Sequence, residues 1–359
     1  MNKRNMRSPL FLLLVLFSSV FFAGSVNAQD EHFSQFFQSP LTLNPALCGS
    51  FNGEMMAEVN YRNQWTSALG DGYGYNTMAA TLEYPDILKS WQGGFLSAGI
   101  SLFSDKAGAI ALTTNEANFT IAGGVFLNSK STLAGGLQAG WAQESMNLQT
   151  VPWDEQYING HYDPNAASGE PVAGNSISYE DFSGGLVYKY SSSSGNISSN
   201  QYTRFAAGAA FYHVNQPDIS FLGSTGAGTK LYMRYVFHTD AEFKTMGSNI
   251  SYAPAIIFFE QGPSREIDAG IKLRYKLGDQ STHTDYHKSN FADFGLYYRV
   301  GDSFIALLQM EFPSYSIGFS YDMNTSQYNA ATSGEGAFEI SLRYTLYGNN
   351  SNMDSRSMY

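Results

Sequence analysis

Apolar and polar residues alternate with a period of two along most of the chain. Residues 270–277, 315–322 and 338–347 are the clearest examples, and residues 77–84 and 231–238 repeat the pattern. Successive side chains of a β-strand point to opposite faces, so this period separates an aliphatic and aromatic face from a polar one. No segment has a comparably clean period of 3.6 residues. The pattern therefore predicts an all-β protein.

Fourteen segments of this kind can be delimited in the sequence. They are 54–63, 75–84, 93–103, 115–127, 132–145, 181–190, 204–213, 229–238, 250–260, 265–276, 290–300, 303–311, 314–322 and 336–347. An even number of strands of about ten residues each is typical of a single-chain bacterial membrane barrel. We therefore predict a single transmembrane antiparallel β-barrel formed by residues 54–347. We expect Leu342 and Ile317 to face lipid, and Arg343, Lys272 and Arg274 to face a polar lumen.

The composition favours a membrane barrel over a soluble β-protein. Aromatic residues make up 15% of the chain and charged residues only 14%, whereas about 25% are charged in typical soluble domains. A large soluble β-sandwich with its polar face in water is the alternative, but its surface would need more charge. The aromatic residues also gather near the ends of the predicted strands, where barrels carry aromatic girdles.

The first 28 residues have the features of an export signal. Lys3, Arg4 and Arg7 precede an apolar stretch over 10–24, and a small-x-small site ends at Ala28. We predict cleavage after Ala28. Removing three of the 20 basic residues leaves 17 against 31 acidic ones, a net charge of −14. This charge argues against nucleic acid as a partner.

For the residues that could take part in catalysis or metal binding, a structural or solvated role is the better explanation. His283, Asp285 and His287 could bind a metal ion, but a solvated turn explains them better. The predicted loop 146–180 has five acidic residues and no Lys or Arg. Such a loop could bind calcium or a basic partner, but we prefer a solvated acidic loop. The acids are Asp154, Glu155, Asp163, Glu170 and Glu180. No nucleophile–base pair is recognisable. We therefore predict a protein that is not an enzyme and needs no cofactor.

The segment that follows the predicted cleavage site is neither a regular helix nor a regular strand. It reads "HFSQFFQSPLTLNPALCGS" over residues 32–50 and contains Pro40 and Pro45. Backbone amides cannot face lipid unpaired, and proline resists joining a sheet. We therefore expect residues 29–53 to enter the lumen from the periplasmic end and plug it; a flexible periplasmic tail is the alternative. The expected plug residues are Phe33, Gln35, Phe36, Asn44 and Pro45, and residues 348–359 are expected to form a C-terminal tail.

The same segment resembles the start of the PorP/SprF family of type IX secretion system membrane proteins of Bacteroidetes. The matching positions are Phe33, Ser34, Gln35, Phe36, Pro40, Leu41, Asn44, Pro45, Ala46 and Gly49, while Ser39 and Cys48 depart from the family pattern. Further segments resemble family motifs in the same order: "NYRNQW" over 60–65, "LFSDKAG" over 102–108, "HVNQP" over 213–217, and the stretch 315–344. The resemblance covers nearly the whole chain after the predicted signal.

The resemblance implies an outer-membrane protein that works with type IX secretion. It implies that the barrel docks or anchors the C-terminal region of a secreted surface protein, such as a large adhesin used in gliding motility. The implied partners are that adhesin, other secretion components and outer-membrane lipid. A FadL-like or porin-like channel for a small solute is the alternative, and an open lumen would favour it.

Four of the resembling segments fall in loops that follow odd-numbered predicted strands. If the N-terminus of the barrel is periplasmic, these loops share the outer rim. We expect an unpaired cluster of aromatic and amide groups there that captures a partner; bracing of the loops against one another is the alternative. The expected rim residues are Trp65, Asp105, His213, Asn215, Gln216, Asp322 and Asn324.

Overall fold

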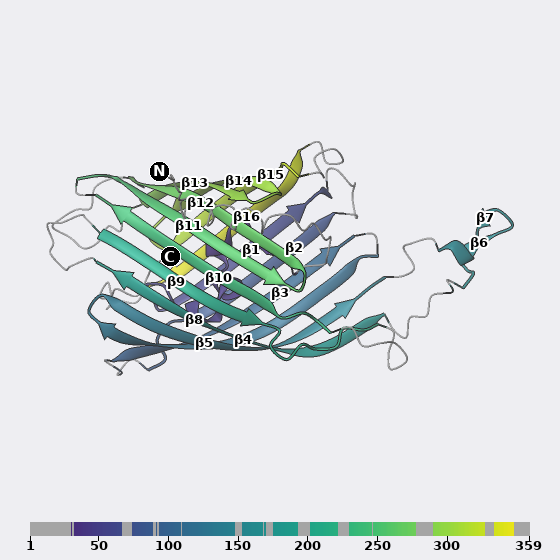
Figure 1. Cartoon of the computed structure of the whole chain (residues 1–359), viewed down its shortest axis with the longest axis horizontal. Helices are drawn as coiled ribbons and strands as arrows, with labels where there is room; N and C mark the ends of the chain where they lie inside the picture. Colours follow the sequence, from purple (N-terminus) through teal and green to yellow (C-terminus); the bar gives the residue numbers. More distant parts are fainter. Residues whose placement is uncertain are drawn as a thin grey trace, which may run out of the picture.

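Fourteen antiparallel strands close into one barrel (Figure 1). The computed structural model describes residues 30, 32–66, 74–88, 91, 93–108, 110–147, 153–167, 169, 175–192, 202–221, 230–245, 247–277, 290–326 and 334–347. The predicted signal peptide, the tail 348–359, residues 283–287 and Glu170 lie outside these residues. The predicted fold class and strand number are confirmed.

Each barrel strand pairs with its neighbours in the chain, and the first pairs with the last. The strands are β1 (Met55–Gln64), β2 (Tyr75–Tyr84), β3 (Gly94–Ala107), β4 (Leu112–Asn128), β5 (Ser131–Ser145), β8 (Ser176–Ser191), β9 (Tyr202–Tyr212), β10 (Arg234–Lys244), β11 (Ile250–Gln261), β12 (Ser264–Leu277), β13 (Asn290–Arg299), β14 (Ser303–Glu311), β15 (Tyr315–Asn324) and β16 (Glu335–Leu346). The barrel closes between β1 and β16, with Met55 opposite Leu346 and Gln64 opposite Ala337. Among the described residues, no helix is long and apolar enough to cross a membrane.

The burial of the strands follows the period of two. On β16, Leu342 is 52% exposed on the outer face, while the neighbouring Arg343 donates to Glu58 across 2.8 Å. Lys272 lies 3.3 Å from the buried Asp293 on the inner side. The predicted lipid-facing and lumen-facing sets are therefore confirmed at these positions. The apolar belt faces outward and the charged side chains are enclosed, as a membrane barrel requires.

One strand lies further along the chain than predicted. The prediction was 229–238, but β10 spans Arg234–Lys244. The sequence "HTDAEFK" over 238–244 is polar enough to suggest a loop, yet its polar residues alternate with Phe243 and pair across to β9 and β11. Because polar side chains of this stretch point into the lumen, the stretch looks hydrophilic in the sequence and its alternation is hard to recognise.

The two rims of the barrel differ in their loops. We call the end at which β1, β3, β9 and β15 terminate the motif rim, and the other end the opposite rim. The loop between β5 and β8 leaves the motif rim and carries a separate hairpin, β6 (Tyr157–Ile158) and β7 (His161–Tyr162), well away from the barrel (Figure 1). At the opposite rim, β4 and β5 are joined by a tight turn between Asn128 and Ser131.

Replacing Leu308 by Arg should destabilise the barrel by about 2–4 kcal/mol, because the exposed face of β14 would place a charge in lipid. The matched control is Gln309→Arg on the next residue, which lines the lumen together with Glu242 and Glu311 and should cost less, because carboxylates instead of lipid surround the new charge. Urea unfolding in lipid vesicles measures both variants. Equal costs for the two substitutions would contradict the assignment of faces.

Candidate functional site: the N-terminal segment and the motif rim

Residues 32–53 form a compact chain of short turns instead of a strand. The turns are η2 (Phe36–Gln38), α2 (Pro40–Leu43) and η3 (Pro45–Leu47). Each proline stands at the first position of its turn, where its missing N–H is not needed. Phe33, Leu41 and Leu47 are nearly fully buried. We call residues 30–53 the N-terminal segment.

The N-terminal segment runs along the inner side of the barrel from one rim to the other. Asp30 lies at the motif rim, where its carboxylate is 2.5 Å from the ring of His213. The backbone N–H of Gly49 donates to Glu83 near the opposite rim, and Glu54 donates to Leu346 there. The segment therefore starts at the motif rim, whereas β1 begins at the opposite rim, so the two cannot both start at the periplasmic end as expected. Which rim is periplasmic stays a prediction. The segment crosses the barrel because the partners of Asp30 lie at the motif rim.

Ser34 stands at the centre of a buried cluster of charges. Its hydroxyl donates to Asp322 at 2.6 Å and accepts from Arg62 and Arg299 at 2.7 and 3.0 Å. Arg62 also pairs with Glu339. All of these groups are at least 95% buried. Buried charges are tolerated only when they are paired and hydrogen-bonded, so the segment and four strands stabilise one another here.

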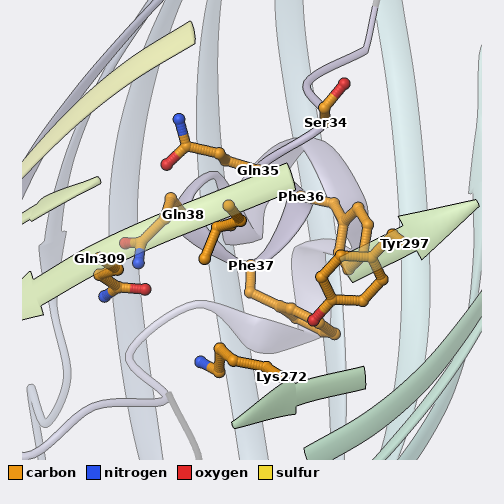
Figure 2. Close-up of a pocket in the computed structure, with 9 residues that line it drawn as sticks. Ser34, Gln35, Phe36, Phe37, Gln38, Lys272, Tyr297 and Gln309 are labelled. Atoms are coloured by element: carbon orange, nitrogen blue, oxygen red, sulfur yellow. The ribbon is translucent and has the colours of Figure 1, made fainter. Parts of the chain in front are cut away.

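The next residues of the segment make polar and aromatic contacts with the wall (Figure 2). The N–H of Gln35 donates to Glu339 at 2.9 Å, and its side chain accepts from Ser341 at 2.8 Å. The ring of Phe36 meets Tyr297 edge to face, with centroids 5.2 Å apart. These directed contacts hold the segment in one register against the strands.

Two glycines let the segment approach the wall closely. The amide of Asn44 donates to the carbonyls of Leu186 and Ala209, each at 3.2 Å. A Cβ at Gly185 would collide with that same side chain, and one at Gly136 would lie 2.5 Å from the N atom of Ala46. A side chain at either glycine would therefore push the segment off the strands.

His213 holds the start of the segment at the motif rim. Its two ring nitrogens lie 2.5 Å from Asp30 and 3.0 Å from Asp181. Burial alone would lower the pKa of His213, but the Asp30 and Asp181 carboxylates outweigh burial and raise its pKa to about 10. The imidazole is therefore charged at neutral pH and binds both carboxylates. Gln261 and Arg234 also contact Asp30.

Asn215 supports the end of β8. Its side chain donates to the carbonyl of Glu180 at 2.6 Å and accepts from the N–H of Phe182 at 3.2 Å. His213 and Gln216 both have positive φ angles, 55° and 44°. The backbone therefore makes a tight turn within the "HVNQP" segment.

The remaining predicted rim residues lie at the same rim but are mostly turned inward. Asp105 accepts from Thr77 at 2.6 Å, and Asn324 donates to the carbonyl of Glu335 at 2.8 Å. The ring of Trp65 packs edge to face on Tyr75. The prediction that these segments share one rim is confirmed, whereas the expectation that their polar groups are unpaired is wrong. Capture of a partner by this rim stays a prediction.

The sequence did not identify the charged partners that these motifs use. The missed residues are Arg62 and Arg299, with Glu266, Asp268 and Glu339 around them. Alternation places each of them on the inner face. Strand register and the path of the N-terminal segment decide which of these residues meet across the lumen. Neither can be predicted from the local sequence.

Within the described part of the chain, no group of three His, Cys, Asp or Glu residues could hold a metal ion. The arrangement is instead a scaffold of ion pairs that joins the N-terminal segment to the motif rim. Such a scaffold can position loops and fill a lumen, and it offers no reacting group.

Several solved structures are similar in fold at low sequence identity. A FadL homologue from Pseudomonas aeruginosa has 12% identity and a TM-score of 0.43, covering 85% of this chain and 93% of that one. The TodX monoaromatic hydrocarbon channel, in a deletion mutant, has 12% identity and a TM-score of 0.45, covering 87% and 94%. The β-domain of the Bordetella autotransporter BrkA has 9% identity and a TM-score of 0.41, covering 82% and 100%. None of the curated proteins matches the chain.

The family comparison covers far more of the sequence than the individual motifs do. The model of the type IX secretion system membrane protein PorP/SprF matches residues 25–344. This range contains the N-terminal segment, the motif rim and all strands but the end of β16. A closed membrane barrel without catalytic machinery agrees with that family and with an outer-membrane location. The chain belongs to the PorP/SprF family of type IX secretion system membrane proteins.

Proposed function

We propose that this barrel docks the C-terminal region of a secreted surface protein, such as a large adhesin, at the motif rim, and that this rim faces the cell exterior. The observation that carries the proposal is the convergence of four family-like segments on one end of the barrel. That end also bears the longest loop, as outward-facing rims of outer-membrane barrels do.

The groups available to a partner are those that the loops do not enclose. Gln216 is exposed and Trp65 is half-buried, whereas the amide of Asn215 is exposed but already bonds the backbone of β8. Aromatic rings supply contact area and amides pair with backbone groups, so such a set suits an extended or β-structured partner. Buried groups such as Asp322 support the rim from inside.

We propose that the N-terminal segment acts as a plug and a brace for this rim. The support for this role is its contacts with strands on several sides of the lumen. A docking protein needs no open pore, whereas a channel does.

The channel alternative has one observation in its favour. A cavity of about 40 Å3 lies beside Phe37 and Gln38 and is lined by charged side chains that include Arg274 and Glu242. It has room for water, and a solute would need it to widen. We rank it second because the segment occupies the path between this space and the motif rim.

Replacing Trp65 and Gln216 together by Ala should release the cognate surface protein into the medium, while the barrel remains abundant and heat-stable. The matched control is Val300→Ala, at an exposed position of the same rim outside the family-like segments. Immunoblots of cells and medium measure the partition. A normally retained surface protein would contradict docking at this rim, and loss of the barrel itself would support bracing.

A further inference from the structure

Strand β8 extends past its neighbour at the motif rim. On one side it pairs with β5 from Ser176 opposite Ser145 onward. On the other side its pairing with β9 begins only at Gly184. The first eight residues of β8, 176–183, therefore have a neighbouring strand on one side only.

Other residues of the protein form hydrogen bonds with some of the backbone groups on this open side of β8. Val214 donates its N–H to the carbonyl of Phe182, and Asn215 covers the N–H of Phe182 and the carbonyl of Glu180. Alternate residues of an antiparallel strand direct their backbone groups to the same side. The backbone groups of Ser176 and Ser178 therefore point to this side as well.

Beyond Asn215, none of the described residues forms a backbone hydrogen bond with this side of β8. Ser176, Ser178 and Glu180 are exposed. Positive φ angles at His213 and Gln216 mark a turn of the backbone beside this edge, and Pro217 cannot donate an N–H. An unpaired edge of this kind accepts an additional strand through main-chain hydrogen bonds.

We propose that the free edge of β8, residues Ser176–Glu180, binds an extended strand of a secreted polypeptide that carries basic side chains. The charge of the surroundings selects the occupant. Glu180 lies on the edge and is exposed, and residues 176–183 include Glu180 and Asp181 but no Lys or Arg. An added strand with Lys or Arg meets opposite charge, whereas a second copy of the acidic edge meets like charge. This inference rests on the proposed docking function and names its contact surface.

The test uses the full-length barrel in detergent and a fluorescein-labelled peptide, Thr-Lys-Val-Lys-Thr-Lys-Val. Ser178→Pro removes one edge N–H without touching the β5 ladder, because proline is tolerated where the N–H faces outward. Ser178→Ala keeps that N–H and is the matched control. Fluorescence anisotropy should give a Kd at least about ten-fold weaker for Ser178→Pro and within about two-fold of wild type for Ser178→Ala.

Two further probes need no mutation. The same peptide methylated on alternate backbone nitrogens, and a version with Glu for Lys, should both bind at least about ten-fold more weakly than the parent peptide. Equal binding of the methylated peptide, equal binding to Ser178→Pro, or a dimer of the barrel that Ser178→Pro dissociates would overturn the proposal. Retention of the surface protein by the Trp65 and Gln216 variant would contradict docking at the motif rim without affecting the peptide result. Failure of the proposed function can therefore be distinguished from failure of the proposed binding edge.

Discussion

Replacing Asp322 by Ala should destabilise the barrel by about 3–5 kcal/mol, although Asp322 lies in a family-like rim segment. Its carboxylate is fully enclosed and sits 3.1 Å from Arg62 and 3.2 Å from Arg299. Removing it leaves two buried guanidinium groups short of a counter-charge, which costs far more than losing an exposed ion pair. The hydroxyl of Ser34 also loses its acceptor. The loss is measured as a lower urea concentration at the unfolding midpoint. The folded barrel is followed on gels by its heat-dependent change in mobility.

The matched control is Asp302→Ala, which removes another carboxylate near the same arginine. Asp302 lies 3.6 Å from Arg299, but its side chain is 35% exposed. Solvent screens such a pair, so the expected cost is at most about 1 kcal/mol. Similar costs for Asp302 and Asp322 would contradict the view that the buried cluster holds the rim and the N-terminal segment together.

Deleting residues 30–50 should raise the single-channel conductance of the barrel well above that of the full chain. In the proposed plug role the segment fills lumen space between the strands, and its loss would admit water to Arg62, Arg299 and Glu339. Planar-bilayer recordings measure the change. A folded barrel with unchanged conductance would mean that the segment does not close the lumen.

A second variant tests the plug without removing any residue. Gly136→Val should displace the segment, because a Cβ there meets the backbone of Pro45 and Ala46. Overpacking of this kind costs about 1–3 kcal/mol. Gly135→Val is the matched control, since that position faces Leu186 instead. Conductance should rise for Gly136→Val and stay at the wild-type value for Gly135→Val.

The barrel could be predicted from the sequence because its environment imposes a simple pattern. Lipid on one side and a polar lumen on the other force strict alternation, and each of the fourteen predicted segments overlaps an observed strand. The errors lie where the pattern weakens. β10 was placed too early because 238–244 is polar on the inner face, and β8 begins five residues before the predicted 181 because its start resembles a loop.

The site could be predicted only in part. Alternation and chain order placed the family-like segments on one rim. They could not reveal that Asp322 and Asp105 point inward, because a polar residue at a strand end suits either a rim or a lumen. The direction in which the N-terminal segment crosses the barrel also depends on ion pairs such as Asp30 with His213, whose members are 183 residues apart.

The measurement that tests docking most directly is site-specific crosslinking in living cells. A photoreactive phenylalanine derivative placed at the exposed Val214 of the motif rim should crosslink to the C-terminal region of the cognate surface protein. The same group at Ser314, in the turn at the opposite rim, should not. Crosslinks from Ser314, or none from Val214 while the surface protein remains attached to the cell, would contradict docking at the motif rim.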